Sequence, residues 1–350
     1  MTFQRGAGSD AEIRHAAAAF AQSDAKRSVL QLVTSFGPFL IGCAAMYAVM
    51  PFSWITAVAL AVPTGALLVR VFIVQHDCGH GSFFASRRAN VLVGRACSLV
   101  TLTPFANWAR QHSLHHADWN NLDRKLGAVG GGSDIYSACL TVEEYLALSP
   151  WRRFFYRLPR HPLIANVVLP PLIFVLLYRV PFDTPRAWVH ERWSVHLTNA
   201  SLVCLFGTLA LLLGWRQVLM VHLSIMVVAS ILGVWLFSLQ HRFETAHWTT
   251  RGDWNFVDAA LRGSSWFNLP RALHWLTGNI GFHHVHHLNP HVPNYRLSAA
   301  HRAVHALRPL TPLSFGRGLA ASFLTLWDDK LGRLVSFREA TKLDRLAGKV

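Results

Sequence analysis

The sequence predicts an all-α integral membrane protein: four transmembrane helices in two hairpins, interfacial or re-entrant helices, and a cytosolic helical cap. Two observations lead to this fold class. Apolar residues make up 52% of the 350 residues, and many of them fall in long continuous runs. A helix of about 20 apolar residues is long enough to cross the ~30 Å hydrocarbon core of a bilayer. Lys and Arg lie mostly outside the two short turns that join these runs, as the positive-inside rule expects.

The four longest runs pair into two hairpins. The expected spans are residues 29–50, 54–74, 197–213 and 217–239. The turns at 51–53 and 214–216 are too short for anything but a reversal of the chain. Lys26 and Arg27 come just before the first span, so that end is expected in the cytoplasm. With an even number of spans, the C-terminus lies on the same side.

Two shorter apolar runs are expected not to cross the membrane. Residues 91–105 are too few for a full span, and Pro104 ends the run. Residues 163–180 are interrupted by Pro170-Pro171. Were this second run a span, the histidine clusters on either side of it would face opposite compartments. We therefore interpret both runs as re-entrant or interfacial, on the assumption that the clusters share one site.

The length and the run pattern indicate one membrane-embedded unit rather than two soluble domains. We expect it over residues 29–310, between a polar N-terminal tail, 1–28, and a C-terminal tail, 311–350. No secretory signal is predicted, because the first 28 residues are polar or Ala-rich. We expect a multi-pass protein that is located in a bacterial inner membrane.

Charge and cysteine content exclude several functions. The net charge of +15 suits anionic lipid or an acidic protein partner. The basic residues match no motif of nucleic-acid readers, so nucleic acid is not an expected partner. The five cysteines are scattered and form no CxxC motif, which argues against a disulfide framework and a thiolate zinc site.

Three histidine clusters carry the chemistry. Within each cluster the spacing is i, i+4 or i, i+3, i+4, which places the imidazoles on one face of a helix. A further histidine ends the last span. The nine candidate metal ligands are His76, His80, His112, His115, His116, His241, His283, His286 and His287. Nine neutral nitrogen donors are enough for two metal ions. Imidazole nitrogen suits iron, zinc or copper, and it does not suit magnesium or calcium. Two adjacent redox metals point to oxygen chemistry.

Other polar residues near the clusters are candidates for supporting roles. Asp77, Asn279 and Glu244 are candidates to hydrogen-bond to ligand imidazoles or to a nearby water. His284 points off the face shared by its neighbours and is not counted as a ligand, although metal binding by His247 or His284 stays open. His301 is expected to be solvated or interfacial.

The motifs resemble those of the membrane fatty acid desaturases, in particular the bacterial delta-12 or omega-6 branch. The resemblance covers about residues 30–310. The segments that carry it are His76-Asp77-Cys78-Gly79-His80-Gly81-Ser82-Phe83-Phe84, His112-Ser113-Leu114-His115-His116, Thr141-Val142-Glu143-Glu144-Tyr145, Gln240-His241-Arg242-Phe243-Glu244, Gly278 to His287 and Pro293-Asn294-Tyr295. The glycine-rich loop 127–132 departs from the more charged stretch typical of the family.

The resemblance implies an O2-dependent enzyme with two non-haem iron ions held by these nine histidines. It implies insertion of a cis double bond into an acyl chain, with electrons from ferredoxin or a cytochrome b5-type protein, since no haem domain is fused. A hydroxylase or ketolase on the same scaffold is the alternative, and a metal transporter is a remote one. The double-bond position, the acyl carrier and the oligomeric state are left open.

Overall fold

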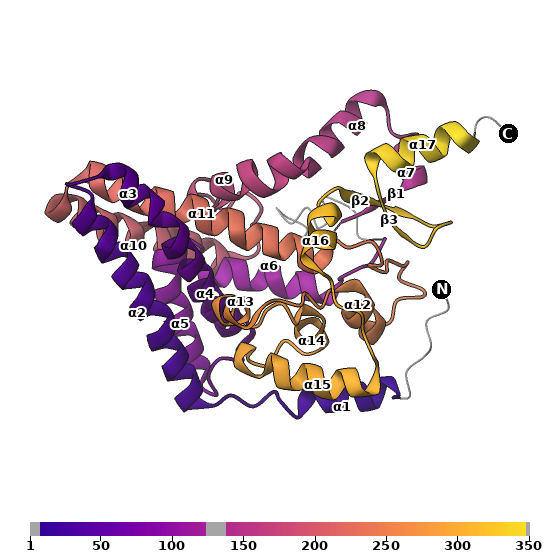
Figure 1. Ribbon diagram of the computed structural model, residues 1–350, viewed down its shortest axis with the longest axis horizontal. Coiled ribbons are helices and arrows are strands. Elements are labelled where there is room, and N and C mark those ends of the chain that lie inside the picture. Colours follow the sequence, from indigo (N-terminus) through magenta and orange to yellow (C-terminus); the bar gives the residue numbers. More distant parts are fainter. Residues whose placement is uncertain (1–7, 124–137, 348–350) are drawn as a thin grey trace.

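The computed structural model describes residues 8–123 and 138–347, and most of these residues are helical. Loop 127–132 lies outside them. The helices are α1 Asp10–Ala18, α2 Ala25–Val49, α3 Trp54–Ala59, α4 Ala61–His80, α5 Arg87–Thr101, α6 Phe105–Ala117, α7 Val142–Ala147, α8 Pro150–Arg157, α9 Leu169–Val175, α10 Val189–Leu213, α11 Trp215–His241, α12 Phe256–Gly263, α13 Arg271–Leu276, α14 His283–Leu288, α15 Leu297–Leu307, α16 Phe315–Ala321 and α17 Phe337–Ala347. Short 3-10 or π turns cover Leu158–Arg160, Ile164–Val168, Leu177–Arg179 and Asn294–Arg296. The long helices lie at one end of the molecule and the small elements at the other (Figure 1).

Four helices in the described residues are long and apolar enough to span a membrane: α2, the joined pair α3–α4, α10 and α11. This agrees with the predicted two hairpins. The helices extend beyond the apolar runs at the polar end, because α4 continues to His80 and α11 to His241. The break between α3 and α4 precedes Pro63, which has no N–H to bond to the preceding turn.

Helix α4 is the centre of the bundle. It packs against α11, α5 and α2, and its buried side chains join the largest apolar cluster. The two helices α4 and α11 approach each other closely at Gly65, where a Cβ atom would lie 2.8 Å from Val228 and 3.0 Å from the carbonyl oxygen of Ile225. Small residues allow this close approach in membrane helices, where lipid offers no hydrophobic drive for helices to associate.

Each of the two shorter apolar runs belongs to a pair of helical segments that meet at a sharp bend, a geometry that a re-entrant loop or a broken span would have. Helices α5 and α6 meet at 101°, and the bend lies between Leu102, which has a positive φ of 54°, and Pro104. Residues 150–160 and 164–179 meet at 47°. Pro170 and Pro171 remove two backbone donors, and the turn before them adopts the wider π geometry. By length alone, each bent pair could also be one span, for a total of up to six.

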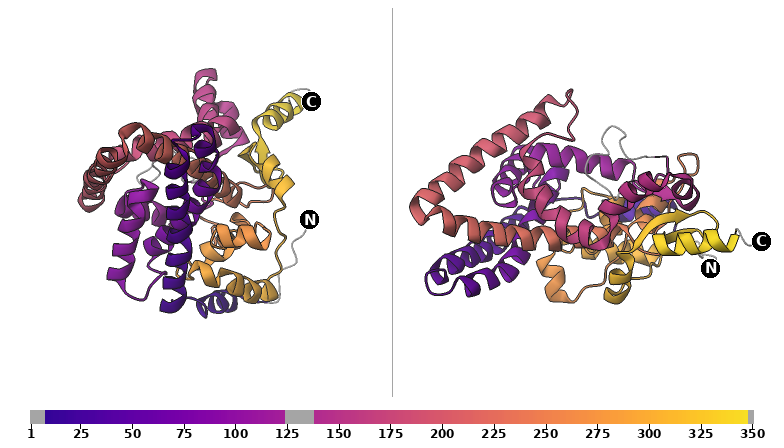
Figure 2. Two further views of the ribbon diagram at one scale, coloured as in Figure 1. Left: turned by 60° about the vertical axis from the view of Figure 1, so that its left-hand side comes forward. Right: turned by 90° about the horizontal axis from the view of Figure 1, so that it is seen from above.

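The cap also contains a three-stranded sheet, which the sequence analysis did not predict. Strand β2, Leu324–Asp328, pairs in parallel with β1, Leu140–Thr141, and antiparallel with β3, Arg333–Ser336. These strands are short, so they give little alternating pattern. The sheet places Trp327 and Leu334 in an apolar cluster with Trp119. The C-terminal segment is therefore packed against the cap, near the end of the molecule that carries both termini (Figure 2).

The N-terminal part of the described chain forms a helix that packs on the cap. Helix α1 begins with a capping box, in which Ser9 and Glu12 satisfy each other's backbone N–H groups. Its buried Ile13 and Ala17 pack with Val304 of α15. From the sequence we expected residues 1–28 to be a polar tail, and the packing of these apolar side chains accounts for the helix that the structure shows within it.

Candidate metal centre

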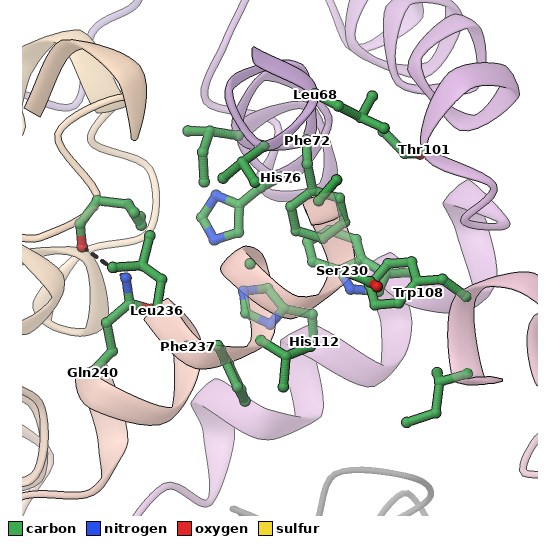
Figure 3. A pocket seen from close by; sticks show the side chains of 18 of the residues that line it. Leu68, Phe72, His76, Thr101, Trp108, His112, Ser230, Leu236, Phe237 and Gln240 are labelled. Carbon is green, nitrogen blue, oxygen red and sulfur yellow. Dashed lines mark hydrogen bonds between the residues drawn. The ribbon is translucent and has the colours of Figure 1, made fainter. Parts of the chain in front are cut away.

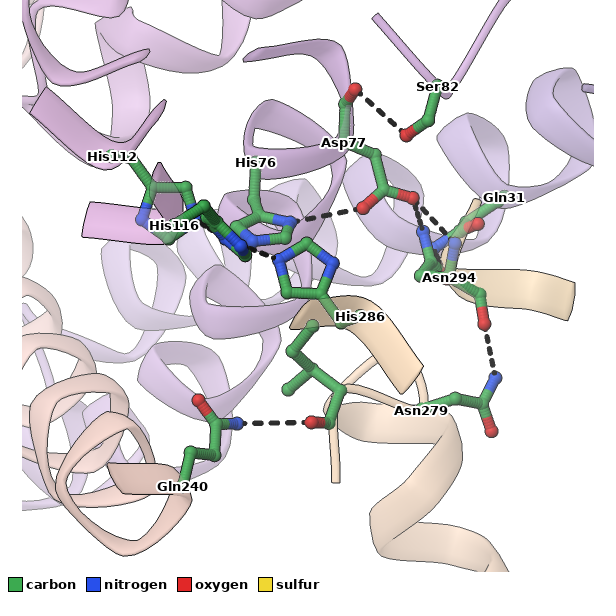
Figure 4. Close-up of polar contacts among 11 residues, drawn as sticks. Gln31, His76, Asp77, Ser82, His112, His116, Gln240, Asn279, His286 and Asn294 are labelled. Carbon is green, nitrogen blue, oxygen red and sulfur yellow. Dashed lines mark hydrogen bonds and ion pairs between the residues drawn. The ribbon is translucent and has the colours of Figure 1, made fainter. Parts of the chain in front are cut away.

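The structure brings all nine candidate histidines together from four separate helices. The last turn of α4 carries His76 and His80, and α6 carries His112, His115 and His116. Helix α11 ends at His241, and the short helix α14 holds the third cluster. Figure 4 shows four of these side chains close together: His76, His112, His116 and His286. Their service as metal ligands stays a prediction, which the geometry below supports.

The histidines form two adjacent groups. One group has its potential ligand atoms all within 4.8 Å of one another: His76, His80, His112, His116 and His286. The second group is His115, His241 and His287, and His283 joins it with its Nε2 atom 3.1 Å from Nε2 of His241. The rings of His116 and His287, one from each group, stack at a centroid distance of 4.1 Å.

The nitrogen atoms face one another in a way that suits a shared cation. Nε2 of His286 lies 3.0 Å from Nε2 of His116, and Nε2 of His115 lies 3.0 Å from Nε2 of His241. Nε2 of His80 and Nε2 of His287 are buried and have no hydrogen-bond partner among the described protein atoms. A buried, unpaired nitrogen costs free energy unless something binds it. The donor set therefore fits two metal ions of the iron, zinc or copper type.

The electrostatic environment keeps these rings neutral. Burial, followed by repulsion from His76, lowers the pKa of His286 well below its ordinary value. Burial and the neighbouring His283 do the same to the pKa of His287. A neutral imidazole offers a lone pair, and a protonated one does not. At neutral pH these rings are therefore ready to bind a cation.

The three predicted supporting residues lie at different distances from the histidines. Asp77 is buried, and its Oδ1 atom lies 3.1 Å from Nδ1 of His76. Asn279 contacts the backbone of Asn294 instead of a histidine. The Glu244 side chain is 63% exposed and forms an ion pair with Arg333. The structure thus supports a direct contact for Asp77 alone.

The expectation for His301 was wrong. It is 6% exposed, and its Nδ1 atom lies 2.9 Å from Nε2 of His284, which is itself fully buried. Burial lowers the pKa of His284 to about 3 and that of His301 to about 4, so the pair is neutral. His284 belongs to neither metal group. His301 lies on α15 and packs against the rings of Trp266 and Phe282, at centroid distances of 4.3 and 4.8 Å. These partners are distant in sequence, so the residues around His301 gave no sign of its burial.

Comparison with known proteins identifies the scaffold. The family model described as fatty acid desaturase matches residues 51–317. A protein of Bacillus subtilis named fatty acid desaturase is 38% identical over 338 residues, which cover 97% of this chain and 94% of that protein. The chain belongs to the fatty acid desaturase family. It is therefore an oxidoreductase of lipid metabolism, as the histidine motifs indicated.

More distant relatives are acyl-lipid desaturases. One from Synechocystis sp., named sn-1 acyl-lipid omega-3 desaturase (ferredoxin), is 27% identical over 80% of this chain and 76% of its own length. One from Picosynechococcus sp., named sn-1 oleoyl-lipid 12-desaturase, is 25% identical over 76% of this chain and 73% of its own length. The resemblance to the delta-12 and omega-6 branch is thus confirmed at the level of relatives.

The desaturase has an apolar cavity of about 210 Å³ that reaches the histidines. His76, His112, His115 and His283 line one end of it, and these residues come from both metal groups. Side chains from α4, α6, α9 and α11 form its walls (Figure 3). Along α11 the lining runs from Gln240 to Met226, about 21 Å at 1.5 Å per residue. The cavity therefore extends from the metal centre into the membrane bundle.

Two tryptophans that the sequence analysis did not single out hold the ligand rings in place. Trp108 stacks on His112 at a centroid distance of 4.7 Å and also lines the cavity. Trp119 packs on His241 at 4.1 Å and donates its indole N–H to the carbonyl oxygen of Gly263. Trp108 lies four residues before His112, so helical spacing could have indicated its contact with the ligand face. No local signal pointed to Trp119, whose partners are distant in sequence.

Proposed function

We propose that this desaturase inserts a cis double bond into the acyl chain of a membrane lipid, using two iron ions and dioxygen. The observation that carries the proposal is the apolar cavity that ends at both histidine groups. An unreactive methylene has no charge for a protein to recognise, so a buried apolar channel beside the metals is the means to hold it. The names of the acyl-lipid relatives support a lipid-bound substrate.

The residues that would hold the iron are the two groups described above, five histidines in one and four in the other. Bound iron supplies dioxygen activation: with O2, two external electrons and two protons, two hydrogens leave the acyl chain as part of two water molecules. The protein's own contribution is to hold the rings in alignment and, through the lowered pKa of His286 and His287, to keep those two neutral. Asp77 fixes the ring of His76 by accepting from its Nδ1–H group.

The cavity walls position the chain and exclude water. Phe72, Trp108 and Phe237 are aromatic residues of the lining beside the histidines, and Leu236 and Ile280 add aliphatic surface. Their packing leaves a narrow apolar space in which a methylene can lie against the metal centre. Such positioning is a large part of catalysis when the substrate has no polar handle, because small displacements of the reacting atoms cost large factors in rate.

The proposed orientation places both termini and the metal centre in the cytoplasm. Basic residues before the first span support it, since cytoplasmic loops retain Lys and Arg. Electrons would come from a separate carrier, a ferredoxin or a cytochrome b5-type protein. The name of the Synechocystis relative mentions ferredoxin. The net charge of +15 suits attraction of an acidic carrier to the cytoplasmic face.

Expression in a host that makes no polyunsaturated lipid tests this function. We expect a new unsaturated fatty acid in the host's membrane lipids, detected by gas chromatography with mass spectrometry. The position of the double bond can be read from the same spectra after derivatisation. An oxygenated fatty acid in place of an alkene would show that the scaffold carries out hydroxylation or ketone formation instead.

Substitution of Gly233 tests the cavity as the acyl site. Gly233 lines the cavity, and a Cβ atom built on it meets no atom within 4 Å. Gly233→Leu should fill part of the cavity without straining α11. We expect desaturation of the native substrate to fall by roughly tenfold or more, because displacement of reacting atoms by about 1 Å can cost 100-fold.

The control for this variant is Gly207→Leu. Gly207 lies on α10, is exposed, and its Cβ position is also open. Both substitutions add the same side chain to a membrane helix, so only the first should alter product yield or chain-length preference. Equal product from the two variants, at equal protein level, would rule out the cavity as the site that holds the chain.

A further inference from the structure

The side chain of Asn294 joins three segments that are far apart in sequence. It is buried, in the turn that follows the third histidine cluster. Its backbone N–H and its Nδ2–H both donate to Oδ2 of Asp77, at 2.7 and 2.8 Å. Its Oδ1 atom accepts from Nε2 of Gln31 on α2 at 2.9 Å. Asn294 thus connects α2, α4 and the third cluster (Figure 4).

The chemistry of the partners fixes which way the amide of Asn294 points. Oδ2 of Asp77 already accepts the backbone N–H of Asn294, and the carboxylate oxygen acts as an acceptor, so the amide nitrogen of Asn294 faces it. The amide oxygen then faces Gln31, whose Nε2 group is a donor. Each polar contact has one donor and one acceptor, and the three side chains are all buried. Both carboxylate oxygens of Asp77 and the side-chain amide of Asn294 are paired, whereas Oε1 of Gln31 has no hydrogen-bond partner among the described protein atoms. The paired contacts restrict the movement of Asp77 and Asn294.

The network ends on a metal ligand. Oδ2 of Asp77 is occupied by Asn294, and Oδ1 lies 3.1 Å from Nδ1 of His76. A carboxylate beside Nδ1 places the ring proton there and leaves the Nε2 lone pair free for a cation. By contrast, Nδ1 of His283 and Nδ1 of His286 have no partner among the described protein atoms. His76 is therefore held by a contact that these two ligands lack.

We propose that Asn294 is a positioning residue for the metal centre: by orienting Asp77 against His76, it fixes the direction of a ligand lone pair. The inference rests on the proposed role of His76 as a ligand. The same amide ties the third cluster to the first. Helix α14 has only six residues and no side-chain cap at its start, so contacts outside it must set its place. Asn294, six residues after its end, supplies one of them directly to α4.

The variant Asn294→Ala removes one of the two donors to Oδ2 of Asp77 and the acceptor for Gln31. We expect the affinity for iron(II) to fall by roughly 10- to 100-fold, the usual loss when a partner of a ligand is removed. The measurement is the metal content of the purified protein after equilibration with iron(II) and a graded chelator. The visible spectrum of the cobalt(II)-loaded protein should also change, since it reports the geometry of the ligands.

The matched control is Asn90→Ala. Asn90 is also buried, and its side chain makes three hydrogen bonds, all of them to the backbone of residues 84 and 86. Both variants should lower the unfolding midpoint, and only Asn294→Ala should weaken metal binding and alter the cobalt spectrum. Wild-type binding and spectrum in Asn294→Ala would overturn the proposal. Equal metal loss in the two variants would overturn it as well.

A second variant keeps the test decisive if Asn294→Ala does not fold. Gln31→Met is close in shape and removes only the donor to Oδ1 of Asn294. We expect a smaller loss of iron(II) affinity, about two- to tenfold, because Asn294 keeps its bonds to Asp77. Unchanged affinity in that case would overturn the role of the network. A wild-type protein that bound no metal would instead overturn the proposed function, so the two failures are distinguishable.

Discussion

His286→Ala is expected to abolish the new fatty acid in the expression assay. His286 is 1% exposed, and its Nε2 atom lies 3.0 Å from Nε2 of His116. It is the only member of its group that comes from the third cluster, so it joins that cluster to the ligands of α4 and α6. Without its imidazole the five-histidine group loses one nitrogen and gains a small cavity. We expect the purified variant to hold less iron than the wild type.

The comparison variant for His286→Ala is His15→Ala. His15 is exposed on α1, away from both metal groups, and loses the same imidazole. It should keep wild-type product and iron content. The measurements are fatty acid composition by gas chromatography and iron per protein chain. A His286→Ala protein with wild-type activity would show that the histidine groups are not the metal centre.

Gly65→Leu is expected to separate the two helices that carry His76 and His241. A Cβ atom at Gly65 would already lie 2.8 Å from Val228, and 3.0 Å from the carbonyl oxygen of Ile225, which cannot rotate away. Overpacking of this kind costs about 1–3 kcal/mol, and more when backbone must move. Because α4 and α11 each end in a ligand, a shift between them displaces both metal groups together.

The expected results for Gly65→Leu are a lower unfolding midpoint in detergent and loss of desaturated product. Gly207→Leu again serves as the control, since its added side chain meets open space on an exposed face of α10. Thermal unfolding followed by size-exclusion fluorescence measures the first effect and fatty acid analysis the second. If Gly65→Leu matched the control in both, the close packing of α4 on α11 would not be needed to align the ligands.

Much of the membrane part could be predicted from the sequence because its signals are local. A run of apolar residues between short turns predicts a spanning helix wherever it occurs, and the helices α2, α4, α10 and α11 follow those runs. The residues at which these helices end were harder to predict. Helix α4 continues to His80, past the apolar run, since its last turn is stabilised by burial against neighbouring helices instead of lipid.

The cap was harder to predict, since its contacts are mostly long-range. Strand β1 has only two residues, and its partner β2 lies more than 180 residues further along the chain. No short stretch of sequence therefore predicts the sheet. The burial of His301 is similar, because it depends on His284 and on the packing of α15 over the third cluster. A polar residue is predicted to be exposed when the sequence does not reveal its buried hydrogen-bond partner.

The sequence by itself determined which residues are the candidate metal ligands. Imidazoles spaced three and four apart share a helix face whatever the rest of the chain does, so eight of the nine candidates could be named from their spacing, and His241 from its place at the end of the last span. Tertiary structure alone decided how they divide, with His115 and His116 of the same helix turn facing different groups. Tertiary structure also decided that an apolar cavity reaches the histidines and that Asn294 hydrogen-bonds to Asp77. Both features depend on contacts between segments that are far apart in the chain, which no local sequence pattern can reveal.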